Sequence, residues 1–199
     1  MLTSLAFVIA AYLIGSVSFA VVTSRAFRLP DPHTYGSGNP GATNVLRSGH
    51  RGAALLTLLG DGLKGFVAVW LALRFGPAAG VLDWTVPAVA LAVFVGHLFP
   101  VFHHFAGGKG VATAAGVITA LSWPLGLALT AVWLVLAFGF RISSVAALVT
   151  AVLAPIGAFY VFGNTATAWV MVPVALLLFW SHRGNIRRLM RGAETTIGR

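Results

Sequence analysis

Long apolar runs separated by short polar segments recur along the whole chain. A helix rises about 1.5 Å per residue and the hydrocarbon core of a bilayer is about 30 Å thick, so one crossing needs roughly 20 apolar residues. Five runs are long and apolar enough to predict membrane-spanning helices. They are Leu2 to Thr23, Ala53 to Phe75, Trp84 to Phe102, Ile142 to Phe162 and Ala166 to Ser181.

The apolar stretch between Lys109 and Arg141 is too long for one crossing, because as a single helix it would measure roughly 45 Å. The pair Trp123-Pro124 favours a turn inside this stretch. Division there produces two short segments, Val111 to Ser122 and Leu125 to Phe140, which require local thinning of the bilayer.

The predicted fold class is therefore all-α. We expect one polytopic integral membrane helical bundle with about seven transmembrane segments, forming a single domain over residues 1–199. The composition agrees, since 58% of the residues are hydrophobic and 9% are charged, whereas about a quarter of a soluble domain is charged. The lack of cysteine excludes a disulfide framework and a thiolate nucleophile.

The charged residues outside the spans are distributed unequally. With seven crossings, only Arg74 and Asp83 face the side opposite to the basic residues, whereas five or six crossings would misplace Arg141 or the arginine-rich tail. The positive-inside rule then predicts a cytoplasmic basic face, an external N-terminus and a cytoplasmic C-terminus. Because the net charge of +9 is spread between apolar spans, we expect membrane lipids or phosphorylated substrates as partners, and no nucleic acid. The basic positions are Arg25, Arg28, Arg47, Arg51, Lys109, Arg141 and the tail from Arg183 to Arg199.

The first polar segment on this face has the sequence GSGNPGATNVLR. Its glycines let backbone N–H groups approach a ligand, and its hydroxyl and amide side chains alternate. An ordinary connection between helices needs only about two to eight residues and has a lower density of glycine. The segment therefore predicts an anion-binding loop, with the candidates Gly36, Ser37, Gly38, Asn39, Thr43, Asn44 and Arg47.

The second polar segment follows the span that ends near His97. A glycine turn, Gly107 to Gly110, leads into the helix that contains Thr113. Free N–H groups and the positive end of the helix dipole favour an anion there, and Lys109 adds a full charge. This pattern predicts a phosphate site, although it lacks the spacing and the strand of a nucleotide-binding P-loop. A lysine at this depth can also simply anchor the end of a helix.

The third polar segment continues the last span beyond the membrane. His182 and Asn185 are three residues apart, so they share one helix face and can both point toward the bundle. We assign Arg187, Arg188 and Arg191 to lipid headgroups.

Several other polar residues allow more than one interpretation. Asp61 and Lys64 lie inside the second span, where we expect them to neutralise each other and face the bundle, in a structural or a catalytic role. Ser143 and Ser144 can cap a helix or line a site, and capping is the simpler hypothesis. No metal site is expected, and four histidines without ligand spacing are assigned to the surface. These are His33, His50, His103 and His104.

Five motifs occur in an order that resembles the PlsY family: GSVSFA, GSGNPGATNVLR, DGLKG, GHLFPVF with GGKGVAT, and HRGNIRRL with ETTIG. The resemblance extends from the first span to the C-terminus. It implies a bacterial plasma (inner) membrane acyltransferase that begins phospholipid synthesis. Such an enzyme transfers the acyl group of acyl phosphate to the 1-hydroxyl of glycerol 3-phosphate, giving 1-acylglycerol 3-phosphate and phosphate. The resemblance further implies a site on the cytoplasmic face, no cofactor and a functional monomer.

The resemblance also implies roles for particular residues. Ser37, Arg47, Lys109, His182 and Asn185 would be catalytic and hold the polar groups of the substrates, whereas Thr43 and the loop Gly107 to Gly110 would hold the acyl-phosphate end. Further substrate-binding positions would be Gly36, Gly38, Asn39, Asn44, His97, Thr113 and Ser143.

An acyl phosphate is already activated, so the expected catalysis consists of orientation and charge stabilisation without a covalent intermediate. We favour a phosphate oxygen of the substrate as proton acceptor over His182. A phosphate or phosphoester transporter is the main alternative function, because glycine-broken helices and intramembrane charges also build transport sites. A transporter predicts internal repeats and a site at the midplane, but the chain shows no convincing repeat and its glycine motifs lie on one face. A structural scaffold would leave the polar loops unexplained.

Overall fold

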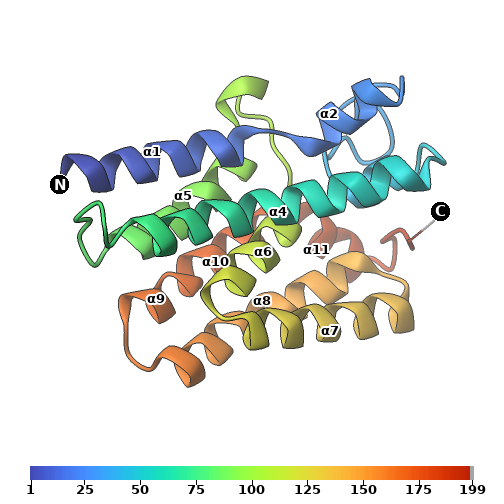
Figure 1. The fold of residues 1–199 in the computed structure, drawn as a ribbon. Helices are drawn as coiled ribbons and strands as arrows, with labels where there is room; N and C mark the ends of the chain where they lie inside the picture. The colour runs from blue at the N-terminus through green and yellow to red at the C-terminus, as the bar shows by residue number, and fades with distance from the viewer. Residues whose placement is uncertain (198–199) are drawn as a thin grey trace.

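The computed structural model describes residues 1–197, and this part of the chain contains helices, turns and loops but no β-strand. Figure 1 shows the helices, most of them running roughly along one direction. The all-α fold predicted from the sequence is confirmed. The helices are α1 Leu2–Ser16, α2 Phe19–Ala26, α3 Ala42–Leu46, α4 Arg51–Phe75, α5 Thr85–Leu98, the 3₁₀ turn η1 Val101–His103, α6 Val111–Leu121, α7 Trp123–Phe140, α8 Ser143–Phe162, α9 Ala166–Trp169, α10 Met171–Ser181 and α11 Arg183–Met190.

The first predicted span is not one continuous helix, and in that respect the prediction was wrong. Helices α1 and α2 meet at an angle of 42°. In an unbroken helix the carbonyl of Val17 would accept the N–H of Val21, but here Ser18 Oγ accepts that N–H at 3.4 Å. Lys64 Nζ in α4 donates to the carbonyl of Val17 instead, at 2.7 Å. A break at membrane depth is tolerated because a side chain satisfies the backbone group that the break releases.

The turn predicted at Trp123-Pro124 is confirmed to within two residues. Helix α6 ends at Leu121 and α7 begins at Trp123, with Pro124 in its first turn. Pro is well tolerated there because the first turn of a helix has no intrahelical partner for its N–H groups. Figure 1 shows that this turn stops short of the end of the bundle where α4 and α5 are joined.

Four helices among the described residues are long and apolar enough to cross a membrane: α4, α5 extended through η1, α7 and α8. The bent pair α1 and α2 makes a fifth candidate. Two shorter apolar helices remain, α6 and the segment Ala166–Ser181 formed by α9 and α10. Seven crossings require both of these to span, so that number stays a prediction.

Helices α4 and α6 approach each other closely at glycines. A Cβ on Gly65 would strike the carbonyl of Thr113, and one on Gly116 would strike the carbonyl of Gly62. Small residues permit such close approach between membrane helices, where van der Waals packing drives association. The contact holds the beginning of α6 against the middle of α4, which fixes the position of the loop that precedes α6.

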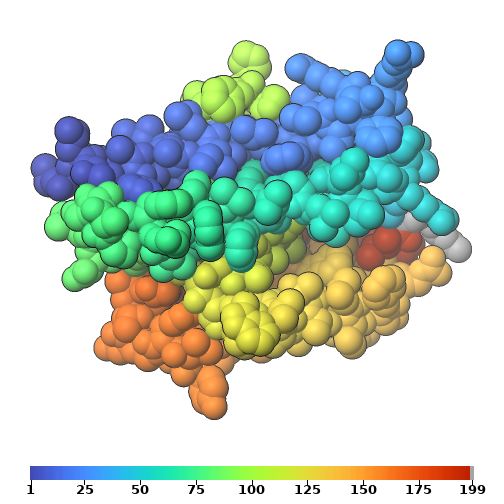
Figure 2. Space-filling view, viewed as in Figure 1, coloured from blue at the N-terminus to red at the C-terminus, as the bar shows by residue number. Residues whose placement is uncertain are grey.

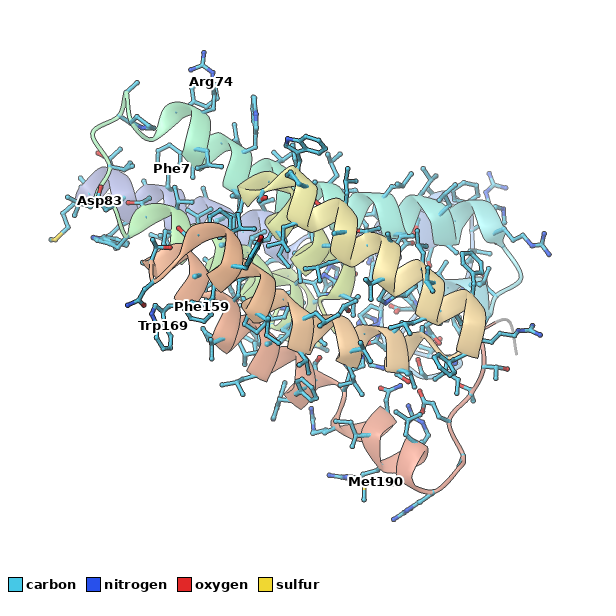
Figure 3. The ribbon with its side chains drawn as sticks, turned by 90° about the horizontal axis from the view of Figure 1, so that it is seen from below. Phe7, Arg74, Asp83, Phe159, Trp169 and Met190 are labelled. Carbon is cyan, nitrogen blue, oxygen red and sulfur yellow. The ribbon has the colours of Figure 1, made fainter. Side chains whose placement is uncertain are left out.

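The two ends of the bundle differ in charge. Arg74 and Asp83 lie at the end that carries the N-terminus and the connection from α4 to α5 (Figure 3). Helices α2 and α11, which carry arginines, lie toward the opposite end (Figure 1). This separation agrees with the charge asymmetry of the sequence. Which end faces the cytoplasm stays a prediction.

Candidate active site

Asn44 in α3 organises the loop of the first polar motif. Its side chain is buried, and Nδ2 donates to the carbonyls of Pro32 at 2.8 Å and Tyr35 at 3.1 Å. Its Oδ1 accepts hydrogen bonds from the backbone N–H of Ser37 at 2.8 Å and from the hydroxyl of Ser37 at 3.1 Å. Gly36 has a φ of +59°, and a Cβ there would strike Asn44 Oδ1. The loop is therefore held in one shape by its own amide side chain.

Arg47 follows α3 and connects this loop to the C-terminal segment. Its Nη2 donates to Thr195 Oγ1 at 2.6 Å, and its Nη1 lies 3.5 Å from Asn44 Oδ1. Contacts on both sides of the guanidinium restrict its orientation. A planar guanidinium held in this way is suited to bidentate recognition of a phosphate group.

Lys109 lies in the glycine turn that leads into α6. Gly110 is the residue before the helix and has a φ of +85°, which favours glycine. Lys109 Nζ donates to Asn185 Oδ1 in α11. Burial, with help from the positive charges of Arg188 and Arg47, lowers the pKa of Lys109 to about 8, while Glu194 opposes the shift. Lys109 is therefore mostly charged at neutral pH, and a modest rise in pH deprotonates it.

His182 is buried at the junction of α10 and α11. Its Nδ1 is 2.9 Å from the carbonyl oxygen of Leu178, and because a carbonyl can only accept, Nδ1 carries the proton. This leaves Nε2 as the ring nitrogen that can accept a hydrogen bond. Burial and the charge of Lys109 lower the pKa of His182 to about 4. The imidazole is therefore neutral at pH 7.

Glu194 is a central residue of the site that the sequence analysis missed. Its carboxylate accepts hydrogen bonds from Asn185 Nδ2, from Ser144 Oγ at 2.8 Å and from Arg188 Nε at 2.7 Å. Burial alone would raise the pKa of Glu194, but these hydrogen bonds outweigh it and lower the pKa. Composition could have pointed to Glu194, because the chain has only 4 acidic residues and Glu194 stands in a strongly basic tail.

Two assignments made from the sequence are corrected here. Arg188 was assigned to lipid headgroups, but it forms an ion pair with Glu194. Capping was favoured for Ser143 and Ser144, but the residue before α8 is Ile142 and no side chain caps that helix. Ser144 instead donates to Glu194. Both differences arise because the chain after α11 folds back onto the bundle, which a pattern of local periodicity does not reveal.

These residues surround one end of a cavity of about 900 Å³. Figure 2 shows a recess between the surface of α4 and the surface of α7, with the C-terminal segment at one end. Away from the polar end the wall is apolar and is formed by α4, α6, α7 and α8. Leu55, Leu59 and Leu63 of α4 belong to this wall and are 55%, 57% and 58% exposed, so the cavity opens sideways toward the lipid-facing surface.

The structure brings most of the predicted site residues to this cavity. Those that line it are Ser37, Asn39, Thr43, Asn44, Arg47, His97, Lys109, Gly110, Ser143, His182 and Asn185. Gly36, Gly38, Gly107, Gly108 and Thr113 do not line it. Gly107 and Gly108 pack against the end of α5, where the N–H of Gly108 donates to the carbonyl of His97 at 3.1 Å.

Four other polar residues of the sequence analysis make defined contacts. Lys64 Nζ lies 2.9 Å from Asp61 Oδ1, and both side chains are buried, so the predicted internal ion pair is present. His50 is more than a surface residue, because its Nδ1 accepts the N–H of Ala53 and caps α4. His33 pairs with Asp31 at 2.6 Å near the surface.

An apolar cavity between membrane helices that ends in cations, hydroxyls and amides suits a molecule with an acyl chain and a phosphate group. The first turn of α6 adds backbone N–H groups to that end, since Gly110, Val111 and Ala112 line the cavity. The fold and the site together define a multi-pass membrane protein with a cavity suited to a phosphate group and an acyl chain.

Comparison with known proteins identifies the family. The glycerol-3-phosphate acyltransferase family matches residues 5–192. The glycerol-3-phosphate acyltransferase of Cupriavidus pinatubonensis is 62% identical over 199 residues, covering 99% of this chain and 98% of the relative. The enzyme of Ralstonia nicotianae is 59% identical over 192 residues, covering 96% and 93%. The chain therefore belongs to the glycerol-3-phosphate acyltransferase family, as the motifs predicted.

Solved structures agree with this assignment. The crystal structure of PlsY, an integral membrane glycerol 3-phosphate acyltransferase, in its glycerol 3-phosphate form has a TM-score of 0.90 and 35% identity, covering 98% of this chain and 96% of that one. The lysophosphatidic acid form of PlsY has a TM-score of 0.88 and 34% identity, covering 98% and 95%. The predicted enzyme class, an acyltransferase, and the predicted membrane bundle are confirmed.

Proposed function

We propose that this protein transfers the acyl group of acyl phosphate to the 1-hydroxyl of glycerol 3-phosphate, releasing 1-acylglycerol 3-phosphate and inorganic phosphate. The observation that carries the proposal is one cavity whose apolar part opens toward lipid and whose polar end holds Arg47, Lys109 and the start of α6. A membrane-embedded acyl chain and a water-soluble phosphoester can meet only at such a boundary. The glycerol 3-phosphate and lysophosphatidic acid forms of the related PlsY support this pair of substrate and product.

The proposed binding sites divide the polar end between two phosphates. Arg47, Lys109 and Asn185 hold glycerol 3-phosphate by charge and hydrogen bonding, and Lys109 and Asn185 are already joined by a hydrogen bond. Thr43, Ser37 and the N-terminus of α6 hold the phosphate of the donor. Asn39, Asn44 and Ser143 line the cavity beside these groups, whereas Gly36, Gly38, Gly107 and Gly108 act through the shape of the loops.

The proposed reaction needs no covalent intermediate with the protein. The 1-hydroxyl oxygen attacks the carbonyl carbon of acyl phosphate, a new ester bond forms, and the bond between that carbon and the phosphate oxygen breaks. Holding the two groups in line can contribute roughly 7 to 11 kcal/mol, and donors directed at the developing oxyanion add about 3 to 4 kcal/mol.

The hydroxyl proton passes to a phosphate oxygen of the substrate in this proposal. The state of His182 supports that route, because a group with a pKa of about 4 is a weak base toward an alcohol at neutral pH. His182 instead accepts a hydrogen bond at Nε2 from the other hydroxyl of glycerol 3-phosphate, the 2-hydroxyl, and thereby orients the substrate. The role of His182 is therefore alignment.

We further propose that the polar end faces the cytoplasm of a bacterial inner membrane, following the positive-inside rule. We propose a functional monomer, because one chain supplies both the apolar part and the polar end of the cavity. We propose no metal or other cofactor, because an acyl phosphate is already activated. We propose that residues 1–199 form one domain, since the same cavity is lined by residues of α3, α4, α5, α6, α7, α8, α10 and α11.

The test is an assay of purified protein with acyl phosphate and carbon-labelled glycerol 3-phosphate, measuring labelled lipid and released phosphate. Stoichiometric formation of both products, lost in Lys109→Ala, supports the proposal. Acyl coenzyme A replaces acyl phosphate in a parallel reaction. Equal turnover with the thioester, or phosphate release that does not depend on glycerol 3-phosphate, would contradict the proposed donor and reaction.

A further inference from the structure

A buried threonine behind the cavity wall connects three helices. Thr113 is the third residue of α6, four positions after Lys109, and its side chain is fully buried. Its hydroxyl donates to the backbone carbonyl of Asp61 in α4 at 2.9 Å and lies 3.1 Å from His97 Nδ1 in α5. Because the hydroxyl proton is used toward the carbonyl, the hydroxyl accepts from His97, and Nδ1 carries the hydrogen.

His97 connects Thr113 to the loop Gly107 to Gly110, which contains Lys109 and is called the lysine loop below. Its backbone carbonyl accepts the N–H of Gly108, the residue directly before Lys109, at 3.1 Å. A Cβ on Gly108 would strike His97 Nε2 and would lie 2.9 Å from the carbonyl oxygen of Pro40 in the first polar motif. Gly108 is therefore held between the imidazole and the other substrate loop.

The Asp61–Lys64 ion pair also contacts the side chain of His97. Asp61 Oδ1 is 3.6 Å from His97 Nδ1, so the carboxylate favours the N–H on that nitrogen. Lys64 Nζ keeps the pair neutral and also holds the broken backbone at Val17. The Asp61–Lys64 ion pair thus helps to hold His97 in place. His97 in turn contacts Thr113 through its side chain and Gly108 of the lysine loop through its backbone carbonyl.

We propose that Thr113 is a positioning residue for acyl transfer, acting through His97 and Gly108 to set the place of Lys109 relative to the first polar loop. A misplacement of about 1 Å far from the reacting atoms can lower a rate about a hundredfold. A hydroxyl that fixes α6 to both α4 and α5 at this point therefore controls catalysis without touching a substrate. The inference rests on the proposed phosphate-binding role of the lysine loop.

The experiment compares three variants. Thr113→Val keeps the volume but leaves the Asp61 carbonyl and the His97 N–H without their partner, Thr113→Ser keeps the hydroxyl, and Thr85→Val is the matched control. Thr85 is a fully buried threonine of α5 whose hydroxyl forms no hydrogen bond within the described residues 1–197. Each variant is measured for kcat, for KM of glycerol 3-phosphate and for melting temperature in detergent.

The expected result is a loss of about tenfold to a hundredfold in kcat/KM for Thr113→Val, including a raised KM for glycerol 3-phosphate. Thr113→Ser should recover most of the loss, and Thr85→Val should match the parent protein. KM is the decisive readout, because it does not depend on how much of the protein is folded. An unchanged KM and kcat per folded molecule in Thr113→Val, or an equal loss in Thr113→Ser, would overturn the inference.

Lys109→Ala is measured in parallel to separate two failures. If Lys109→Ala keeps near-normal turnover, the phosphate-binding role of the loop is wrong whatever Thr113 does. If Lys109→Ala is inactive and Thr113→Val behaves like the parent protein, only the positioning role of Thr113 is wrong.

Discussion

The charge of Lys109 should set the alkaline limit of activity. Burial, together with Arg188 and Arg47, lowers the pKa of Lys109 to about 8. The lysine is a cation below this pKa and neutral above it, so phosphate binding by Lys109 is present at lower pH and is lost as the pH rises through about 8. For one titrating group of this pKa, the charged fraction falls from about three quarters at pH 7.5 to about a tenth at pH 9, a roughly eightfold change.

The assay measures kcat/KM for glycerol 3-phosphate between about pH 6.5 and 9.5, because this quantity reports the ionisation of the free enzyme. The phosphate ester of the substrate loses its second proton near pH 6, so its charge is almost constant above pH 7.5. His182 titrates at about 4, far below this range. We expect kcat/KM to fall about eightfold from pH 7.5 to 9.

The control is Lys109→Arg, because a guanidinium stays charged across the whole range. Its absolute activity will be lower, since arginine does not reproduce the contact with Asn185, but its residual activity should lack the alkaline decline. An identical decline in Lys109→Arg would assign the titration to another group. A constant kcat/KM of the parent protein up to pH 9.5 would show that burial does not lower the pKa of Lys109 in the way described.

Three further substitutions test the remaining parts of the site. His182→Gln keeps hydrogen bonding without basicity and should lose much less activity than Lys109→Ala; an equal loss would restore His182 as the general base. Arg47→Ala should eliminate most activity at an unchanged melting temperature, because a phosphate charge is left without its partner, and near-normal turnover would remove Arg47 from the site. Glu194→Ala leaves three donors without their acceptor and should lower the free energy of unfolding by about 2 to 3 kcal/mol, measured by thermal unfolding in detergent; an unchanged stability would show that the tail is not held by this carboxylate.

Hydropathy predicted the helical regions well because apolar length is a local property of the chain. It placed the turn near Trp123 correctly, since a proline tolerated in the first turn of a helix leaves a local signature. It did not predict the break after α1. The residues Val17 and Ser18 carry little signal by themselves, and the break depends on Lys64, which is 47 positions away from Val17.

The glycine-rich motifs predicted where the site lies but not how each residue acts. Ser37, Lys109 and His182 line the cavity as expected, because their motifs lie in loops or at helix ends of the polar face. Thr113 belongs to the same motif as Lys109 yet points into a helix contact. Glu194 was missed because its partners are brought together only when the tail folds back. Spacing along the chain identifies neighbours on one helix, whereas contacts between helices need the tertiary packing.

The charges at the polar end of the cavity suggest why glycines and hydroxyls accompany the cations. Arg188 forms an ion pair with Glu194. Arg47, Arg51 and Lys109 line the cavity as well and bring positive charge to it. In the proposed complex two phosphate groups carry about three to four negative charges at neutral pH, which these three cations at most just neutralise. Neutral donors, namely hydroxyls and the N–H groups at the start of α6, have to complete the coordination. Such donors hold an anion less tightly than a bidentate arginine does. In the proposed reaction, a donor phosphate bound mainly by them can leave after transfer, whereas glycerol 3-phosphate is held by the cations until its hydroxyl has attacked.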